Sequence, residues 1–144
     1  DDYFETLLKE DDLLTLPGNH LLLEMSFLAA PSKLEDYLFQ SRLKGYQLIL
    51  AHPERYIYLR KQYSQYERLR DLGCKFQVNL LSLIGYYGKE IKKNAFRLLK
   101  NGWVEYLGTD CHHGQHLELL TKAMHRGEFN FPKINFENNT IAPA

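Results

Sequence analysis

The 144-residue sequence has little of several features that mark special classes of protein. It holds only two cysteines, Cys74 and Cys111, too few for the disulfide framework of a small secreted domain. Its 18 basic and 18 acidic side chains cancel, so the molecule lacks the net positive charge that attracts a protein to nucleic acid or anionic membrane. It also lacks an apolar run of about 18 residues, the length that a membrane-spanning helix requires. These absences favour a reduced, cytoplasmic globular protein with no membrane span and no nucleic-acid partner.

The first residues lack the features of a natural start. Asp1 and Asp2 are unlike the basic opening of a signal peptide. They lead directly into a helical spacing of apolar residues at positions 3–8. We therefore expect a fragment of a longer protein that is about one domain in size.

Four short apolar runs predict strands of a parallel sheet that is buried on both faces. They are Leu21–Phe27, Gln47–Ala51, Lys75–Leu80 and Val104–Gly108. A segment with helical periodicity follows each run, namely Lys33–Lys44, Tyr63–Leu72, Lys89–Lys100 and His116–Arg126. Such repeated βα units predict an α/β fold, which is either an open doubly wound sheet or a piece of a β/α barrel. The tail Phe131–Ala144 is expected to be irregular.

Some local features of these units are also predicted. Ser32 is expected to cap the first helix, whose Leu38 and Leu43 are expected to face the core. His20 is expected on the surface. Residues 79–88 are expected to form a polar, flexible turn, because they combine Asn79 and Ser82 with two glycines.

Polar side chains stand at the end of every predicted strand. Glu24 comes directly after Leu21-Leu22-Leu23, and His52 follows the second run. Asn79 comes directly after Phe76-Gln77-Val78, and Asp110 and His112 follow the fourth run. The first four of these residues are 28, 27 and 31 positions apart. The carboxyl ends of parallel strands form the edge at which β/α active sites assemble. Glutamate, aspartate and histidine are ligands for manganese, iron or zinc, so this register predicts a metal site.

Each residue also has a plainer explanation. Glu24 alone could be an ion-pair partner, and His52 could be a core or helix-capping histidine. Arg55, three residues after His52, could clamp a phosphate with its guanidinium or pair with the neighbouring Glu54. The sequence favours neither role for Arg55. The recurrence of metal-binding residue types at four strand ends is what favours the metal site.

At these positions the sequence resembles the later motifs of the polymerase and histidinol phosphatase (PHP) superfamily. Within it, the sequence is most similar to the bacterial capsular-polysaccharide tyrosine phosphatases. The similarity runs from about Asp1 to Arg126. Its motifs are Leu22-Leu23-Glu24-Met25-Ser26-Phe27, Leu50-Ala51-His52-Pro53-Glu54-Arg55-Tyr56, Gln77-Val78-Asn79 and Gly108-Thr109-Asp110-Cys111-His112.

The resemblance implies a fold, a cofactor and a set of site residues. Residues 1–144 would form the C-terminal part of a single PHP-type metallophosphatase domain, about four βα units of a distorted seven-stranded barrel. Glu24, His52, Asp110 and His112 would bind a divalent metal cluster, with manganese expected first and iron or zinc as alternatives. Arg55 would bind the phosphoryl group beside His52 and Asp110 at the catalytic centre.

The resemblance also implies a substrate and a partner. The reaction would be hydrolysis of phosphotyrosine, and the substrate would be the phosphorylated tail of a bacterial capsule tyrosine kinase. Members of the superfamily begin with a His-x-His pair on a first strand, which this sequence lacks. Four βα units would leave an open, apolar sheet edge that a homo-oligomer would cover.

Two alternatives remain at this point. The first is a PHP-type phosphatase for a small ester such as histidinol phosphate, and the second is a catalytically silent PHP-like module that binds a partner. An exposed Arg55 beside an aromatic run would favour a flat peptide substrate over a small ester. The tyrosines of that run are Tyr56, Tyr58, Tyr63 and Tyr66.

Overall fold

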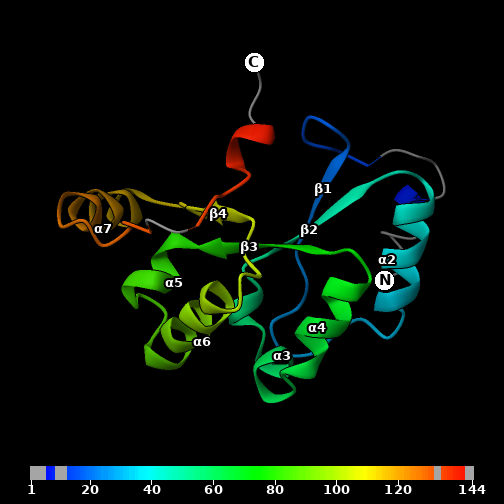
Figure 1. Ribbon diagram of the computed structural model, residues 1–144, viewed down its shortest axis with the longest axis horizontal. Helices are drawn as coiled ribbons and strands as arrows, with labels where there is room; N and C mark the ends of the chain where they lie inside the picture. The colour runs from blue at the N-terminus through cyan, green and yellow to red at the C-terminus, as the bar shows by residue number, and fades with distance from the viewer. Residues whose placement is uncertain (1–5, 9–12, 132–133, 142–144) are drawn as a thin grey trace.

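The described part of the chain, residues 6–8, 13–131 and 134–141 of a computed structural model, contains one parallel sheet. Its order is β1 (His20–Leu23), β2 (Gln47–Ala51), β3 (Lys75–Asn79) and β4 (Tyr106–Gly108) (Figure 1). Each neighbouring pair of strands is parallel. The predicted α/β class and parallel sheet are therefore confirmed. The helical pattern expected at residues 3–8 falls mostly outside the described residues.

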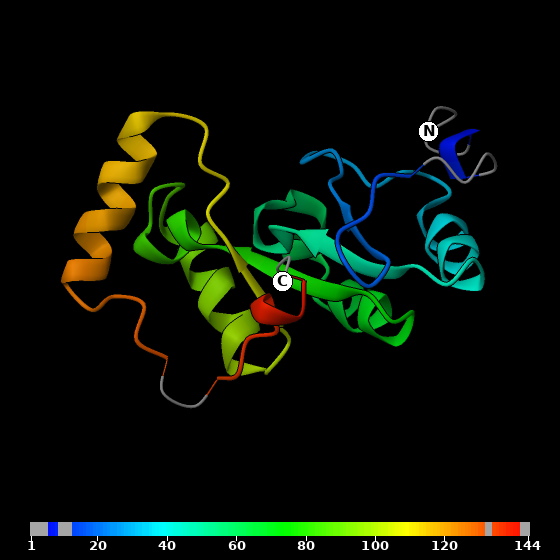
Figure 2. The same cartoon turned by 90° about the horizontal axis from the view of Figure 1, so that it is seen from above.

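At least one helix follows each strand, as the repeated pattern predicts. In chain order they are α2 (Leu34–Leu43), η1 (Pro53–Arg55), α3 (Ile57–Lys61), α4 (Ser64–Asp71), α5 (Leu80–Ile84), α6 (Lys89–Lys100), α7 (Gly114–His125) and η2 (Asn138–Thr140). Helices α3 to α6 cover one side of the sheet, and the tail that holds η2 lies on the other side (Figures 1 and 2). Figure 2 also shows α7 extending from one end of the molecule. No helix in the described part of the chain is long and apolar enough to cross a membrane.

The core is built on the two central strands. Strand β2 is buried on both faces, since Leu48 and Ile49 are each 1% exposed. Strand β3 instead alternates between buried Phe76 and Val78 and half-buried Lys75 and Gln77. Each buried apolar side chain contributes about 1.5–3 kcal/mol relative to an exposed position. The core therefore fixes β2 and β3, whose carboxyl ends carry His52 and Asn79.

The first strand is shorter than its apolar run. It ends at Leu23, and the prediction that it extends to Phe27 is wrong. The backbone beyond Leu23 makes other hydrogen bonds: Met25 N–H donates to the Tyr56 hydroxyl at 3.0 Å, and Ile57 N–H donates to Phe27 O at 3.0 Å. Met25 and Phe27 are partly buried because they pack on the core from a loop. The apolar run therefore predicts neither strand pairing nor uniform burial, since Leu22 is 49% exposed.

Two short helices, α3 and α5, were not predicted. Helix α3 comes after the His-Pro-Glu-Arg turn. Helix α5 occupies part of the segment 79–88, so the expected flexible turn is wrong there. Asn79 starts α5 as its N-cap, because its side-chain oxygen accepts a hydrogen bond from Leu81 N–H at 2.9 Å. An asparagine before Leu80-Leu81-Ser82-Leu83 was the signal that would have indicated this helix.

Three local expectations also need correction. Helix α2 begins at Leu34 after Lys33, without a side-chain cap from Ser32. Leu43 is 67% exposed because it lies in the last turn of α2, whereas Ser41 is buried instead. His20 is buried, since its Nδ1 lies 2.7 Å from Pro17 O and its ring meets Tyr106 edge-on.

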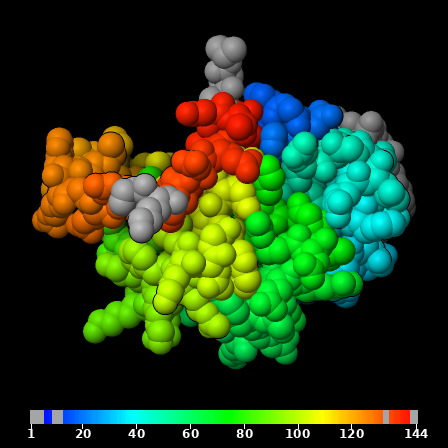
Figure 3. Space-filling view, in the orientation of Figure 1, coloured from blue at the N-terminus to red at the C-terminus, as the bar shows by residue number. Residues whose placement is uncertain are grey.

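The C-terminal tail covers the outer edge of β4. Glu137 N–H donates to Glu105 O at 2.7 Å. The Asn138 side chain accepts from Leu107 N–H at 3.0 Å and donates to Leu107 O at 2.7 Å, as a neighbouring strand would. Figure 3 shows residues 134–141 packed against the segment that contains β4. The described part of the tail is irregular apart from η2, and it protects a sheet edge.

Candidate functional site

The polar residues that follow the four strands lie together at one edge of the sheet, here called the carboxyl rim: Glu24, His52, Asn79, Asp110 and His112. His52 N–H donates to Gln77 O at 2.7 Å, so the chain stays in register beside β3 until it leaves the sheet. Asn79 pairs with Gly108 two residues before Asp110. Strand register, which the sequence spacing predicted, therefore brings these residues to the same edge.

His52 is buried in a strained conformation. Its φ is 35°, in the left-handed region that a residue with a side chain rarely adopts. Its Nε2 lies 3.3 Å from Glu24 Oε1, while its buried Nδ1 has no hydrogen-bond partner. Burial lowers the pKa of His52, and the nearby Arg55 lowers it further. The ring is thus held neutral, the form in which histidine binds a metal.

Asp110 is the residue on which several rim contacts converge. Its φ is 47°, again in the left-handed region. Asp110 Oδ2 accepts a hydrogen bond from Arg55 Nη1 at 3.0 Å and another from Asn79 Nδ2 at 3.2 Å. The His112 Nδ1 atom is 3.5 Å from Asp110 Oδ1 and 2.8 Å from Asp110 O. The Asp–Cys–His motif therefore forms a local pair, with the His112 ring largely exposed.

Sequence reasoning did not identify Glu54 as a residue of this region. Its side chain is fully buried, and its Oε1 accepts hydrogen bonds from Asn79 N–H at 3.1 Å and from the Ser82 hydroxyl. Its Oε2 has no partner, and burial raises its pKa to about 7. The Pro53-Glu54-Arg55 segment has a composition typical of an exposed turn, so no local pattern indicated that Glu54 is buried.

Arg55 pairs with Asp110 and not with the neighbouring Glu54, so the plainer alternative is wrong, while the phosphate-clamping role stays a prediction. Its side chain is only 19% exposed, so the expectation of an openly exposed arginine is wrong. The Cζ atom lies 4.5 Å from the centre of the Phe27 ring and 4.2 Å from the centre of the Tyr87 ring. The guanidinium is therefore fixed by one carboxylate and two aromatic faces.

The tyrosines that the sequence placed near Arg55 serve the core instead. Tyr56 and Tyr66 are fully buried, and the Tyr66 hydroxyl donates to Pro53 O at 3.0 Å. Asn94 donates to Glu54 O at 3.2 Å from the next helix layer. These contacts hold the His-Pro-Glu-Arg turn in place, and they remove the argument that a run of exposed tyrosines favours a flat substrate.

The candidate metal ligands form two pairs. Glu24 lies beside His52, and Asp110 lies beside His112. Among residues 6–8, 13–131 and 134–141, no three His, Cys, Asp or Glu side chains come close enough together to hold a metal ion. The chemistry of the donors, together with the unpartnered His52 Nδ1, fits a divalent cation, but these residues supply pairs and not one closed set.

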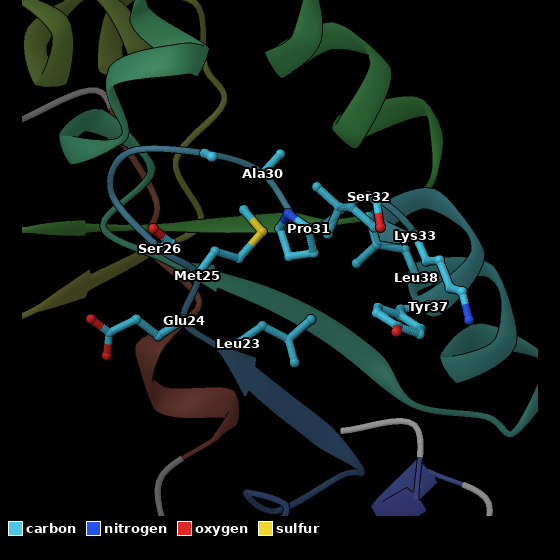
Figure 4. A pocket seen from close by; sticks show the side chains of 12 residues that line it. Leu23, Glu24, Met25, Ser26, Ala30, Pro31, Ser32, Lys33, Tyr37 and Leu38 are labelled. Atoms are coloured by element: carbon cyan, nitrogen blue, oxygen red, sulfur yellow. The ribbon is translucent and has the colours of Figure 1, made fainter. Parts of the chain in front are cut away.

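A groove of about 490 Å³ begins beside Glu24 and runs toward the start of α2. Figure 4 shows Glu24 at one end, Lys33 and Tyr37 at the other, and Met25 and Pro31 between them. The rim is thus continuous with a partly apolar hollow on the β1–α2 loop.

Comparison with known proteins shows the family to which this sequence is similar. The sequence model of the CpsB/CapC family, described as capsular polysaccharide synthesis, matches residues 1–124. Tyrosine-protein phosphatase YwqE of Bacillus subtilis (strain 168) is 31% identical over 93 residues, which are 65% of this chain and 37% of YwqE. Putative tyrosine-protein phosphatase CapC of Staphylococcus aureus is 25% identical over 95 residues, or 66% of this chain and 37% of CapC.

A solved structure shows the same arrangement of the chain. It comes from work on YwqE from Bacillus subtilis and CpsB from Streptococcus pneumoniae, which are described as metal-dependent tyrosine phosphatases. It matches 89% of this chain and 53% of its own chain, with a TM-score of 0.73 and 28% identity. The present chain thus spans 37% of the length of each curated relative and about half of the solved one. Because the family model covers most of its residues, the chain belongs to the CpsB/CapC family of capsular polysaccharide synthesis.

Proposed function

We propose that this chain is part of a metal-dependent protein-tyrosine phosphatase that acts in capsular polysaccharide synthesis. The observation that carries the proposal is the carboxyl rim, where Asp110 accepts a hydrogen bond from Arg55 and lies beside His112 while Glu24 meets His52. The family match and the names of the relatives support this assignment. The hydrolysed bond would be the phosphomonoester of a phosphotyrosine.

The fold of the complete domain is part of the same proposal. The four parallel strands would belong to a distorted PHP-type barrel in which further strands continue beyond β1. On that side β1 is the terminal strand of the sheet, and its Leu22 is 49% exposed. A second copy of the chain or further strands of the same domain would cover this edge.

The rim residues divide into two roles. Glu24, His52, Asp110 and His112 would bind a divalent metal cluster, with manganese expected ahead of iron or zinc and with further ligands from outside this chain. When bound, such metal ions lower the pKa of an attacking water and offset negative charge on phosphoryl oxygens. Arg55 would orient the phosphoryl group through the guanidinium donors that do not bond Asp110. Asn79 holds Asp110 by a second hydrogen bond.

The substrate and setting follow from the family. We expect the substrate to be the phosphorylated tyrosine tail of a capsule tyrosine kinase, and the location to be the cytoplasm. The two cysteines support a reducing compartment, since Cys74 is buried, Cys111 is exposed, and both are free.

A second candidate function is a silent binding module. It is favoured by one observation, the absence of any three-donor metal group among the residues that the structure describes. In that case the rim would bind a phosphorylated partner through Arg55 without hydrolysing it.

The test combines metal content with activity. Elemental analysis after loading with Mn²⁺ would compare the chain with its His52→Ala variant, in which a large part of the metal affinity should be lost. Hydrolysis of a phosphotyrosine peptide and of histidinol phosphate would then be measured. A chimera in which the N-terminal part of YwqE precedes this chain would supply further ligands. If the metal-loaded chimera hydrolyses neither ester, the proposal of a phosphatase is refuted and the binding module is favoured.

A further inference from the structure

The Arg55 guanidinium lies against two aromatic rings from different loops. Phe27 comes from the β1–α2 loop, and Tyr87 comes from the turn between α5 and α6. The Arg55 Cζ atom lies over both ring faces, at 4.5 Å and 4.2 Å from their centres. We call these two rings the aromatic clamp.

The turn that carries Tyr87 has a defined backbone. Gly85 and Gly88 flank the Tyr86-Tyr87 pair with φ values of 86° and 100°, which residues with side chains rarely adopt. Gly85 N–H and Tyr86 N–H donate back into α5, and Gly88 N–H donates to Gly85 O. Tyr86 packs against Tyr87 at 5.0 Å and against His116 at 4.9 Å between ring centres. The Gly-Tyr-Tyr-Gly segment, which is no phosphate loop, thus presents one ring to Arg55.

Phe27, the other ring of the clamp, is also fixed by contacts with neighbouring residues. Its carbonyl accepts the Ile57 N–H, which ties the loop to the start of α3. Its ring stacks on Tyr56 at 5.7 Å and lies 5.4 Å from the His52 ring. Contacts within the chain therefore hold both rings of the clamp.

This arrangement restricts how Arg55 can bind a ligand. A guanidinium donates hydrogen bonds only in its own plane, and the two ring contacts limit how that plane can turn. One donor, Nη1, is already directed to Asp110. An incoming anion must therefore meet the remaining in-plane donors, in a direction fixed relative to Asp110.

We propose that Phe27 and Tyr87 are positioning residues that hold the Arg55 guanidinium for the phosphoryl oxygens of the substrate. The inference rests on the proposed function and deepens it. It assigns part of the affinity for the phosphoryl group to two aromatic residues outside the two candidate metal-ligand pairs. Their loss would leave Arg55 free to turn, so the main effect would fall on phosphate binding. A cation–π contact at a partly buried site corresponds to about 3- to 30-fold in affinity.

The experiment compares four forms of the protein: the parent, Tyr87→Leu, Tyr87→Phe and Tyr63→Leu. Tyr63 is the matched control, since its ring also carries an arginine, with Arg97 Cζ 3.3 Å from its centre, but it belongs to the α4 side of the molecule. Calorimetry would measure the affinity for inorganic phosphate, and kinetics on a phosphotyrosine peptide would give KM and kcat. We expect Tyr87→Leu to weaken phosphate binding and raise KM by about 3- to 30-fold with a smaller change in kcat. Tyr63→Leu should resemble the parent. Tyr87→Phe keeps the ring but loses the hydroxyl that hydrogen-bonds the Asn79 side chain, so it should lose less phosphate affinity than Tyr87→Leu.

The same substitutions in an Arg55→Lys background separate positioning from general packing. If Tyr87 acts through the planar guanidinium, Tyr87→Leu should cause little further loss of phosphate affinity there. Equal phosphate affinity for the parent and Tyr87→Leu, or an undiminished loss in the Arg55→Lys background, would overturn the clamp. If the parent and the YwqE chimera hydrolyse no phosphotyrosine, the proposed function fails, while the phosphate affinities still decide about the clamp.

Discussion

The two ends of the sheet both carry clusters of charged residues, but only one cluster is satisfied by its own members. At the amino ends of β3 and β4, Glu105 accepts from Arg70 Nη1 at 2.7 Å and from Phe76 N–H at 2.9 Å. Glu137 of the tail accepts from Lys75 and from the Tyr106 hydroxyl at 3.2 Å. Each carboxylate there is paired with a cation and with a further donor.

The carboxyl rim differs in polar satisfaction and in backbone strain. Three buried side-chain atoms in the described part of the chain lack a hydrogen-bond partner, and two of them are His52 Nδ1 and Glu54 Oε2. His52 and Asp110 also have positive φ values, which cost of order 1–3 kcal/mol each. An unsatisfied, strained polar cluster is expected where a ligand completes it, whereas a fully paired cluster is expected where the fold is held together. From this comparison we expect binding at the carboxyl rim and a contribution to stability at the amino ends.

The largest predicted effect comes from the rim arginine. Arg55→Ala should lower kcat/KM for phosphotyrosine peptide by about 10²–10³-fold, the loss typical of one preorganised donor to developing charge. The melting temperature should fall less than in Arg70→Ala, since Asp110 is 26% exposed and keeps its bond from Asn79. Kinetics and thermal unfolding of the same preparation check both parts. A large loss of stability without loss of activity would reverse the assignment of the two ends.

The matched substitution at the other end should show the opposite pattern. Arg70→Ala removes the cation from the Glu105 carboxylate, whose side chain is 14% exposed. We expect a loss of about 1–3 kcal/mol in the free energy of unfolding, because a mostly buried acceptor loses its charged donor. Urea unfolding would measure this loss, and KM should stay at the parent value. If Arg70→Ala abolished activity at unchanged stability, the comparison would fail.

A smaller effect is expected from the tail. Asn138→Ala removes both hydrogen bonds that its amide makes to Leu107, so the free energy of unfolding should fall by about 1 kcal/mol. Asn138→Asp keeps the acceptor and loses the donor, so its loss should be intermediate. Amide hydrogen exchange at Leu107 would report the same change locally. Unaltered exchange in Asn138→Ala would show that the tail does not protect the edge of β4.

The smallest effect concerns pH. The hydrogen bond from Lys75 lowers the pKa of Glu137 below its ordinary 4.5. The stability from this pair is therefore present above pH 4.5 and is lost as the pH falls through the folded-state pKa. The pair is partly exposed, so the amount should be about 0.2–1 kcal/mol. Glu137→Gln should be less stable than the parent at pH 7, and the difference should shrink as the pH falls below 4.5. A difference that persists unchanged to pH 3 would mean that the carboxylate charge is not responsible.

Local sequence determined most of the secondary structure. Gln47–Ala51 and Lys89–Lys100 have the bounds that were predicted, because a run of buried aliphatic residues and a regular amphipathic spacing leave little choice. The run Leu21–Phe27 does not have its predicted bounds. Its second half leaves the strand and is held by hydrogen bonds with Tyr56 and Ile57, which no local pattern encodes.

The site divides in the same way. Periodic spacing alone indicated that Glu24, His52, Asn79 and Asp110 would reach one edge, because parallel strands of equal repeat align their carboxyl ends. The metal-ligand roles of Glu24, His52, Asp110 and His112 remain predictions.

Only the tertiary structure decided which neighbours these residues have. It buried Glu54 beneath Asn79 and Ser82, paired Arg55 with Asp110, and placed Phe27 and Tyr87 on the guanidinium. Phe27 and Tyr87 are 60 positions apart in the sequence and meet through Arg55 only because separate loops leave adjacent strands at one edge. The sequence by itself determined the elements and the register of the rim, since both depend on local periodicity. The electrostatic state of the rim depends on burial and on long-range contacts, which arise only when the strands pair.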